Sequence, residues 1–153
     1  MIVGITGAVG AGKSTLAQTY AARGFAVLDV DEVAAETVRA LGRSPREVLI
    51  ELLTGGPQRA ALEAVLVPEV KRRIAAWCAT TPGDKVIDSA LLFEHGLDAL
   101  CDETICVTCP REERLRRVLA RGTTSAAFFD AIERAQWPEA EKAARATRLV
   151  ASK

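Results

Sequence analysis

A glycine-rich segment near the start of the chain carries the clearest chemical pattern in the sequence. Residues 4–15 read GITGAVGAGKST, and the part from Gly7 to Ser14 matches G-x-x-x-x-G-K-[ST] between an apolar run and a helical stretch. In such a loop, backbone amides at a helix N-terminus surround phosphate oxygens. The sequence therefore predicts a nucleoside triphosphate site with these phosphate-binding residues: Gly7, Ala8, Val9, Gly10, Ala11, Gly12, Lys13, Ser14 and Thr15.

Two side chains of this loop have chemical roles of their own. Lys13 should reach the β- and γ-phosphates, and Ser14 should offer its hydroxyl to Mg²⁺. We therefore expect a nucleoside triphosphate with Mg²⁺ at this site. The loop does not identify the phosphate acceptor. A GTPase transfers the phosphate to water, a kinase transfers it to a substrate hydroxyl, and a motor or pump couples hydrolysis to movement.

An acidic pair after the second apolar run could select the acceptor. In VLDVDEV, Asp29 and Asp31 are expected to share one face of a strand end, beside the phosphate loop. A small-molecule kinase needs a carboxylate there to take or orient the proton of the acceptor hydroxyl. The alternative is that Asp31 only caps the following helix, with Glu32 in its first turn.

Alternating strands and helices must position these groups. Strands are predicted at residues 2–6, 26–29, 85–89, 103–108 and 148–151, and helices at 13–22, 31–80 with breaks at Gly42, 55–57 and Pro68, then 110–121, 125–135 and 138–146. Buried apolar strands that alternate with helices indicate an α/β fold, with a parallel sheet covered on both faces. Ligands of such folds bind at the carboxyl ends of the strands, where the glycine loop and the acidic residues lie.

Composition limits the class of protein. The chain has 153 residues, 49% of them hydrophobic and 26% charged, which suits one globular domain. Its 20 basic and 20 acidic residues cancel, so we expect no nucleic acid and no membrane as partners. No apolar run approaches the ~20 residues that span a bilayer. The N-terminus lacks the charged leader of a signal peptide, so a cytoplasmic location is expected.

The cysteines need separate consideration. Three of the four, Cys101, Cys106 and Cys109, have the spacing C-x4-C-x2-C, which resembles part of an iron–sulfur ligand set. Cys106 and Cys109, however, lie in or beside the apolar run TICVTC, and residues three apart on a strand point to opposite faces. We therefore interpret them as small buried side chains, with no iron–sulfur cluster or zinc expected.

The chain resembles the dephospho-coenzyme A kinase family in several ordered segments. These are MIVGITGAVGAGKST, VLDVDEVA, KVIDSALLFEHGLDALCDETICV, and PREERLRRVLAR followed by AIERAQWP. The resemblance implies a P-loop NTPase fold like that of nucleoside monophosphate kinases, a three-layer sandwich with a central parallel five-stranded sheet. It also implies one domain over residues 1–153, with a helical substrate-side insertion at 40–80 and a lid at 117–135.

The same resemblance assigns roles to individual residues. Asp31 would be the catalytic base. Asp88, Leu92, Phe93 and Glu94 would shape the acceptor side of the cleft, and Asp88 is a second candidate ligand for Mg²⁺. Arg117 and Arg121 match the basic positions of the lid, where a planar guanidinium suits phosphate oxygens. We favour Arg121, which precedes Gly122, as the catalytic arginine and place Arg117 among the phosphate-binding residues.

Some positions differ from the family pattern. Val67-Pro68 stands where the family has His-Pro, Ala90 replaces the proline of D-x-P, and the only histidine, His95, follows the LLFE run. His95 is interpreted as a loop residue, with a substrate contact as the alternative. The chain is also shorter than typical members, mainly within 40–67 and after Val150.

The expected activity is ATP-dependent phosphorylation of the 3′-hydroxyl of dephospho-CoA, by a monomer whose partners are ATP and dephospho-CoA. Two alternatives remain open: another small-molecule kinase on the same scaffold, and a regulatory homologue that binds ATP without transferring phosphate. A GTPase is disfavoured because the sequence contains no N/T-K-x-D guanine-reading motif.

Overall fold

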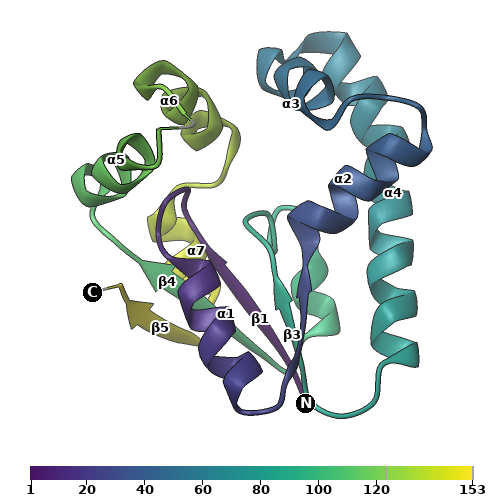
Figure 1. Ribbon diagram of the computed structural model, residues 1–153, viewed down its shortest axis with the longest axis vertical. Coiled ribbons are helices and arrows are strands. Elements are labelled where there is room, and N and C mark those ends of the chain that lie inside the picture. The colour runs from purple at the N-terminus through teal and green to yellow at the C-terminus, as the bar shows by residue number, and fades with distance from the viewer. Residues whose placement is uncertain (123, 153) are drawn as a thin grey trace. The chain divides into compact units, whose positions relative to one another are not determined.

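The computed structural model describes residues 1–122 and 124–152. Its elements are shown in Figure 1 and follow in this order: β1 (Ile2–Gly7), α1 (Lys13–Ala22), β2 (Ala26–Asp29), α2 (Val30–Ala40), α3 (Pro45–Thr54), α4 (Gly56–Thr80), β3 (Lys85–Asp88), the short 3₁₀ helix η1 (Leu97–Leu100), β4 (Glu103–Thr108), α5 (Arg111–Ala120), α6 (Ala126–Ala135), α7 (Glu139–Arg145) and β5 (Arg148–Ala151). Each predicted strand is present.

A five-stranded sheet in the order β2-β3-β1-β4-β5 forms the centre of the fold. Strand β1 pairs in parallel with β3 and with β4, and β4 pairs in parallel with β5. The predicted parallel five-stranded sheet is therefore confirmed. Because β1 occupies the middle of the sheet, its carboxyl end is flanked by the ends of β3 and β4, where ligand-binding side chains can converge.

Both faces of β1 are covered, as the apolar strands predict. Val3 and Ile5 are buried in one cluster with Ala17 and Tyr20 of α1. On the other face, a Cβ added at Gly4 would lie 2.7 Å from Cys101 Sγ. Helices α7 and η1 also contact β1, and α7 contacts β4. The sheet is thus sandwiched between helical layers, which is why its strands contain so few polar residues.

The chain divides into two compact units. Unit 1 comprises Met1–Val27 and Gly83–Lys153, and unit 2 comprises Leu28–Pro82. Unit 1 contains β1, α1, the start of β2 and everything from β3 onward, and so holds the phosphate loop. Unit 2 contains α2, α3 and α4, with a small core of its own formed by Val38, Val48 and Leu66.

Helix α4 corrects one predicted boundary. The predicted breaks at Gly42 and near Gly55 are present, but the break at Pro68 is wrong, because α4 runs unbroken from Gly56 to Thr80. Its buried residues Leu66, Val70 and Ile74 lie on both sides of Pro68 at helical spacing. Packing of this apolar stripe outweighs the hydrogen bond that a proline removes from the interior of a helix.

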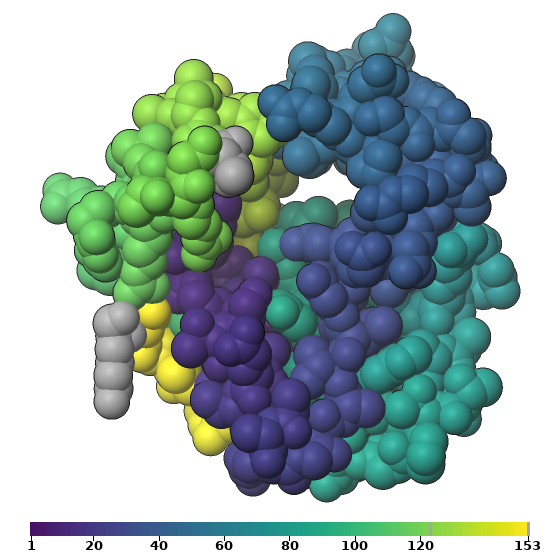
Figure 2. Space-filling view, viewed as in Figure 1, coloured from purple at the N-terminus to yellow at the C-terminus, as the bar shows by residue number. Residues whose placement is uncertain are grey.

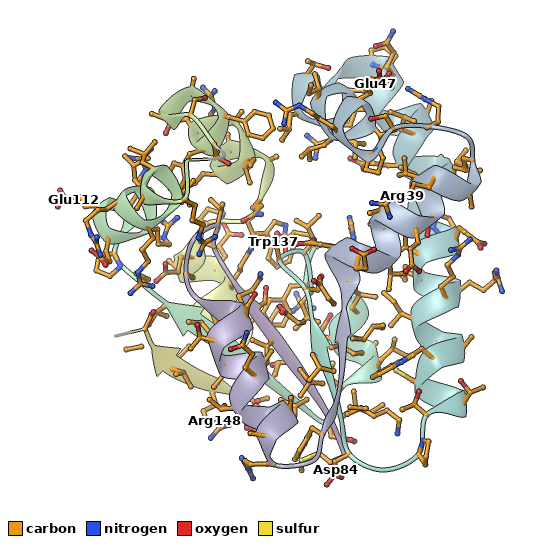
Figure 3. The ribbon with its side chains drawn as sticks, viewed as in Figure 1. Arg39, Glu47, Asp84, Glu112, Trp137 and Arg148 are labelled. Carbon is orange, nitrogen blue, oxygen red and sulfur yellow. The ribbon has the colours of Figure 1, made fainter. Side chains whose placement is uncertain are left out.

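At one edge of unit 1, strand β5 is tied to α1 by a polar contact. Arg148 donates a hydrogen bond of 2.7 Å to the Tyr20 hydroxyl and pairs with Glu103 at 2.9 Å. Figure 2 shows the yellow residues of β5 beside the purple residues of α1, and Arg148 is labelled at this edge in Figure 3. These contacts fix the last strand on the sheet. None of the described helices is long and apolar enough to cross a membrane.

The buried cysteines belong to this sheet. Cys106 on β4 and Cys109 just after it are buried, whereas Cys78 and Cys101 are partly exposed. Burial is the main reason that the pKa of Cys106 rises to about 11, so its thiol is neutral at pH 7. Within residues 1–122 and 124–152, no group of three or more His, Cys, Asp or Glu side chains is arranged to hold a metal ion.

Candidate active site

The phosphate loop connects the end of β1 to the start of α1. Helix α1 begins at Lys13, so Lys13 and Ser14 lie in its first turn, where backbone N–H groups have no partner within the helix. Within the loop, the Ala11 N–H donates to the Ala8 carbonyl at 3.0 Å. The loop therefore has a defined turn, and it presents a helix N-terminus suited to an anion.

Two glycines of the loop adopt conformations that a side chain would disturb. Gly10 has φ +81°, and a Cβ there would lie 2.8 Å from the Arg114 carbonyl oxygen. Gly12 has φ +94°, and a Cβ there would lie 3.1 Å from Ser152 Oγ. Both positions combine a left-handed backbone with close neighbours, which explains structurally why glycine occupies them.

Lys13 and Asp88 come together at the carboxyl ends of adjacent strands. Asp88 is the last residue of β3 and is opposite Ile5 of β1 in the parallel register. Lys13 Nζ lies 3.6 Å from Asp88 Oδ1, and the Asp88 side chain is 9% exposed. The structure thus brings a cation and a carboxylate side by side next to the glycine-rich loop.

The donor set at this place suits Mg²⁺ bound together with a nucleotide. Ser14 is exposed in the first turn of α1, and Asp88 supplies carboxylate oxygens. Mg²⁺ prefers oxygen ligands and is usually held by one or two protein groups plus substrate phosphates and water. A hydroxyl and one carboxylate are therefore sufficient, and a cluster of acidic residues is not required.

Arg117 lies against the phosphate loop. Its Nη1 donates to the Ala11 carbonyl at 3.4 Å and to Ser152 Oγ at 2.7 Å, and its Nε donates to Glu113 at 3.2 Å. Hydrogen bonds from Arg116 and Arg117 lower the pKa of Glu113 to about 2, so that carboxylate is ionised at neutral pH. The predicted phosphate-binding role of Arg117 remains a prediction, but its guanidinium is next to the loop.

Arg114 is a site residue that the sequence did not single out. It is buried, and it donates to the Val9 carbonyl at 3.3 Å and to the Cys109 carbonyl at 3.0 Å. It also forms an ion pair with Glu133 of α6. Arg114 therefore joins the phosphate loop to the predicted lid. Five arginines crowd residues 111–121, and their spacing alone could not show which one is buried.

Arg121 lies apart from these contacts. It is exposed at the C-terminal end of α5, and its side chain makes no hydrogen bond or ion pair with another described residue. The next residue, Gly122, has φ +73°. The predicted lid at 117–135 includes Thr123, which lies outside the described residues, and the catalytic role of Arg121 stays a prediction.

The acidic pair is arranged differently from the expectation. Asp29 ends β2, and its side chain accepts a hydrogen bond from the Asp31 N–H at 2.9 Å, so Asp29 is the N-cap of α2. Asp31 lies in the first turn of α2, and both side chains are exposed. The predicted shared face of a strand end is therefore wrong, and the cap is Asp29 rather than Asp31. Helix α2 begins at Val30, and Asp, Asn and Ser are preferred caps at such starts.

The strand order corrects a second expectation. Strand β2 is not the neighbour of β1, because β3 lies between them. The carboxylate next to the phosphate loop is therefore Asp88 at the end of β3. The sequence could not give this order, since the crossover from β2 through α2–α4 lets β3 pair with either edge of β1.

The LLFE segment forms a turn after β3. Leu92 and Phe93 are buried, with exposed fractions of 0% and 4%, and Glu94 is largely buried. Leu92 packs against β1, where a Cβ on Gly4 would meet its side chain at 2.9 Å. Substrate binding by Leu92, Phe93 and Glu94 remains a prediction. His95 is partly exposed in the same turn.

Comparison with known proteins agrees with this geometry. A family model described as dephospho-CoA kinase matches residues 1–46 and 39–153. A dephospho-CoA kinase of Thermus thermophilus is 40% identical over 96% of this chain and 80% of its own length. One of Ruegeria pomeroyi is 33% identical over 97% of this chain and 85% of its own length.

A solved structure has a similar fold and sequence. The crystal structure of a Thermus thermophilus protein superimposes with a TM-score of 0.87 at 37% identity, over all of this chain and 88% of that chain. Sequence similarity, fold and the phosphate loop with its neighbouring carboxylate thus agree along nearly the whole length. The chain belongs to the dephospho-CoA kinase family and has the P-loop kinase fold.

Proposed function

We propose that this protein transfers the γ-phosphoryl group of ATP to the 3′-hydroxyl of dephospho-CoA, giving CoA and ADP. The observation that carries the proposal is the phosphate loop, with Lys13 3.6 Å from Asp88, in a chain 40% identical to a dephospho-CoA kinase. The intact Lys13 and Asp88 count against a regulatory homologue that binds ATP without transferring phosphate. On this proposal the protein acts in the cytoplasm as a monomer.

Residues of unit 1 would bind and orient the nucleotide. The loop amides and Lys13 hold the phosphates, and Arg117, beside the Ala11 carbonyl, adds positive charge near them. Ser14 and Asp88 would hold Mg²⁺, which supplies charge neutralisation between the phosphates when it is bound. Fixed donors of this kind act mainly by stabilising the charge of the transferring group, with little covalent chemistry from the protein.

We assign acceptor activation to Asp31. The acceptor oxygen bonds to the γ-phosphorus, the bond from that phosphorus to the β–γ bridging oxygen breaks, and ADP leaves. The proton of the acceptor hydroxyl goes to the Asp31 carboxylate. Asp31 is exposed in the first turn of α2 and is not needed as the helix cap, which is Asp29. Arg121 and the lid at 117–135 would close over the phosphates and exclude water.

The test is an ADP-release assay across several acceptors, with the product identified by mass spectrometry. Dephospho-CoA, nucleosides and shikimate are compared at equal concentration, and the expected result is CoA from dephospho-CoA alone. Lys13→Ala should lose roughly 10²-fold or more in turnover, the scale of removing one preorganised charge. Lys71→Ala, which removes an exposed lysine of α4, is the matched control and should keep full turnover.

The outcomes separate the candidate functions. ADP release with another acceptor and none with dephospho-CoA would keep the kinase class and reject this acceptor. ATP binding without phosphoryl transfer to any acceptor would favour the regulatory homologue. Equal turnover of Lys13→Ala and the unmodified protein would mean that the loop is not the catalytic phosphate site.

A further inference from the structure

Lys142 of α7 is a fully buried cation that is not among the predicted site residues. Its side chain is 0% exposed, which is rare for a lysine without a specific partner. Its ammonium donates to the Ala90 carbonyl at 2.7 Å and lies 3.4 Å from Glu94 Oε2. Burial lowers the pKa of Lys142, and the Glu94 carboxylate opposes that shift. The buried charge is thus held by two acceptors on the turn that follows β3.

The first acceptor lies next to the phosphate site. The Ala90 carbonyl also accepts a hydrogen bond of 3.3 Å from Thr6 Oγ1 of β1. Only Ser89 separates Ala90 from Asp88, the residue paired with Lys13. A shift of the Ala90 peptide is therefore transmitted through one residue to the carboxylate beside the phosphate loop.

The second acceptor leads to the predicted lid. Glu94 Oε2 also accepts a hydrogen bond of 3.1 Å from the N–H of Trp137, which follows α6 and is labelled in Figure 3. The other oxygen, Oε1, is buried and receives no hydrogen bond from the described residues. The Glu94 carboxylate therefore depends on Lys142 and Trp137 for its stabilisation.

We propose that Lys142 is a positioning residue for phosphoryl transfer. It holds the turn at Ala90–Glu94, so that Asp88 keeps its place beside Lys13. Through Glu94, the same turn also stays attached to the segment that follows the predicted lid. This inference rests on the proposed function. Lys142 acts through Ala90 and Glu94 and does not itself touch the reacting groups. Its contribution should therefore be seen in kcat rather than in substrate binding.

A pair of substitutions separates positioning from simple stability. Lys142→Met keeps the length of the side chain but leaves the Glu94 carboxylate buried without its cation, so it should destabilise the fold. Adding Glu94→Gln removes that uncompensated charge, and the double variant should recover most of the lost stability. It cannot restore the hydrogen bond from Lys142 to Ala90.

The double variant is therefore expected to fold with nearly normal stability and to turn over slowly. We expect kcat to fall roughly 10-fold or more, since misplacement by about 1 Å can cost up to ~10²-fold. The KM for ATP should change by less than about 3-fold, as for a loss confined to the transition state. Amide hydrogen exchange of residues 89–92, measured without substrates, should become faster.

Lys85→Met is the matched control. Lys85 is also buried and donates to a backbone carbonyl, that of Gly83, but it lies at the opposite end of β3. The kcat of Lys85→Met and the amide hydrogen exchange of its residues 89–92 should be unchanged. Full recovery of kcat together with stability in the double variant would show that the pair is only structural and overturn the proposal. Unchanged exchange at 89–92 would also overturn it, and this readout holds whichever acceptor the enzyme uses.

Discussion

At the scale of single residues, the two aspartates at the junction of β2 and α2 have different roles, one in helix capping and one in the proposed chemistry. Asp29 accepts the Asp31 N–H as the cap of α2, which leaves the Asp31 carboxylate out of the cap. Asp31→Asn keeps the shape of the side chain but cannot take a proton. It should retain ATP affinity and stability and lose roughly 10²–10⁴-fold in kcat, the usual scale of general-base catalysis. Single-turnover kinetics measure the rate of phosphoryl transfer, and ATP titration measures the affinity for ATP.

Asp29 provides the controls for this prediction. Asp29→Asn keeps a good cap and should leave both kcat and stability nearly unchanged. Asp29→Ala should lose about 1 kcal/mol of unfolding free energy in urea while kcat per folded molecule is preserved. Asp31→Asn with normal kcat would remove Asp31 from the mechanism, whatever its effect on stability.

The sequence predicts phosphate-binding residues at 7–15 because the motif is local, and spacing along the chain is enough to locate it. The binding role of these residues stays a prediction. Arg114 and Lys142 were not recognised, since their importance comes from contacts with distant parts of the chain, the Val9 and Ala90 carbonyls. Burial of a cation depends on tertiary packing, and a run of arginines or a helical lysine has the same pattern when it is solvated.

At the scale of elements, the turn from β1 into α1 depends on glycine at position 10. Gly10→Ala would place a Cβ 2.8 Å from the Arg114 carbonyl oxygen in a left-handed conformation. A carbonyl of α5 cannot yield as a flexible side chain can, so the loop must shift. We expect a loss of more than about 2 kcal/mol of unfolding free energy, together with weaker nucleotide binding.

Gly24, just after α1, is the matched control. It has φ +93°, and a Cβ there would meet nothing within 4 Å. Gly24→Ala should therefore show only the conformational cost of about 1–2 kcal/mol and normal nucleotide affinity. Urea unfolding of both variants compares their unfolding free energies, and ATP titration compares their affinities for ATP. Equal losses of stability with equal affinities would mean that the contact at Gly10 has no effect.

The segment after α5 is expected to move as a lid. Gly122 has φ +73° and lies between α5 and α6, and Arg111 joins the two helices by pairing with Asp130 and Glu133. An ATP analogue with acceptor should slow amide exchange over 117–122 and 124–135, because closure orders such segments. Exchange in β4, at 103–108, is the internal control and should not change. Equal protection of 124–135 with and without ligands would contradict a moving lid.

Element boundaries were predictable where local signals are strong. The strands at 103–108 and 148–151 have the predicted limits, and Gly42 and Gly55 lie at predicted helix ends. Pro68 predicts a helix break because its signal is local, whereas the packing of Leu66, Val70 and Ile74 that maintains α4 is not local.

At the scale of the whole molecule, strand order and the grouping of elements were beyond the sequence. Alternating strands and helices predict a parallel sheet, but the alternation does not show that β3 lies between β2 and β1. Likewise, the sequence predicts helices at 31–80, whereas the separate core at Val38, Val48 and Leu66 follows from packing.

This separate core predicts that the two units unfold independently. Val48 is 3% exposed in unit 2 and Val86 is 0% exposed in unit 1, so each Val→Ala change removes the same buried methyl groups at a cost of about 1–3 kcal/mol. Because the two valines belong to different clusters, Val48→Ala should speed amide exchange within Leu28–Pro82 and leave β1 and β4 protected. Val86→Ala should speed exchange in β1 and β4. If Val48→Ala instead speeds exchange equally in β1, β4 and α4, the chain unfolds as one cooperative unit.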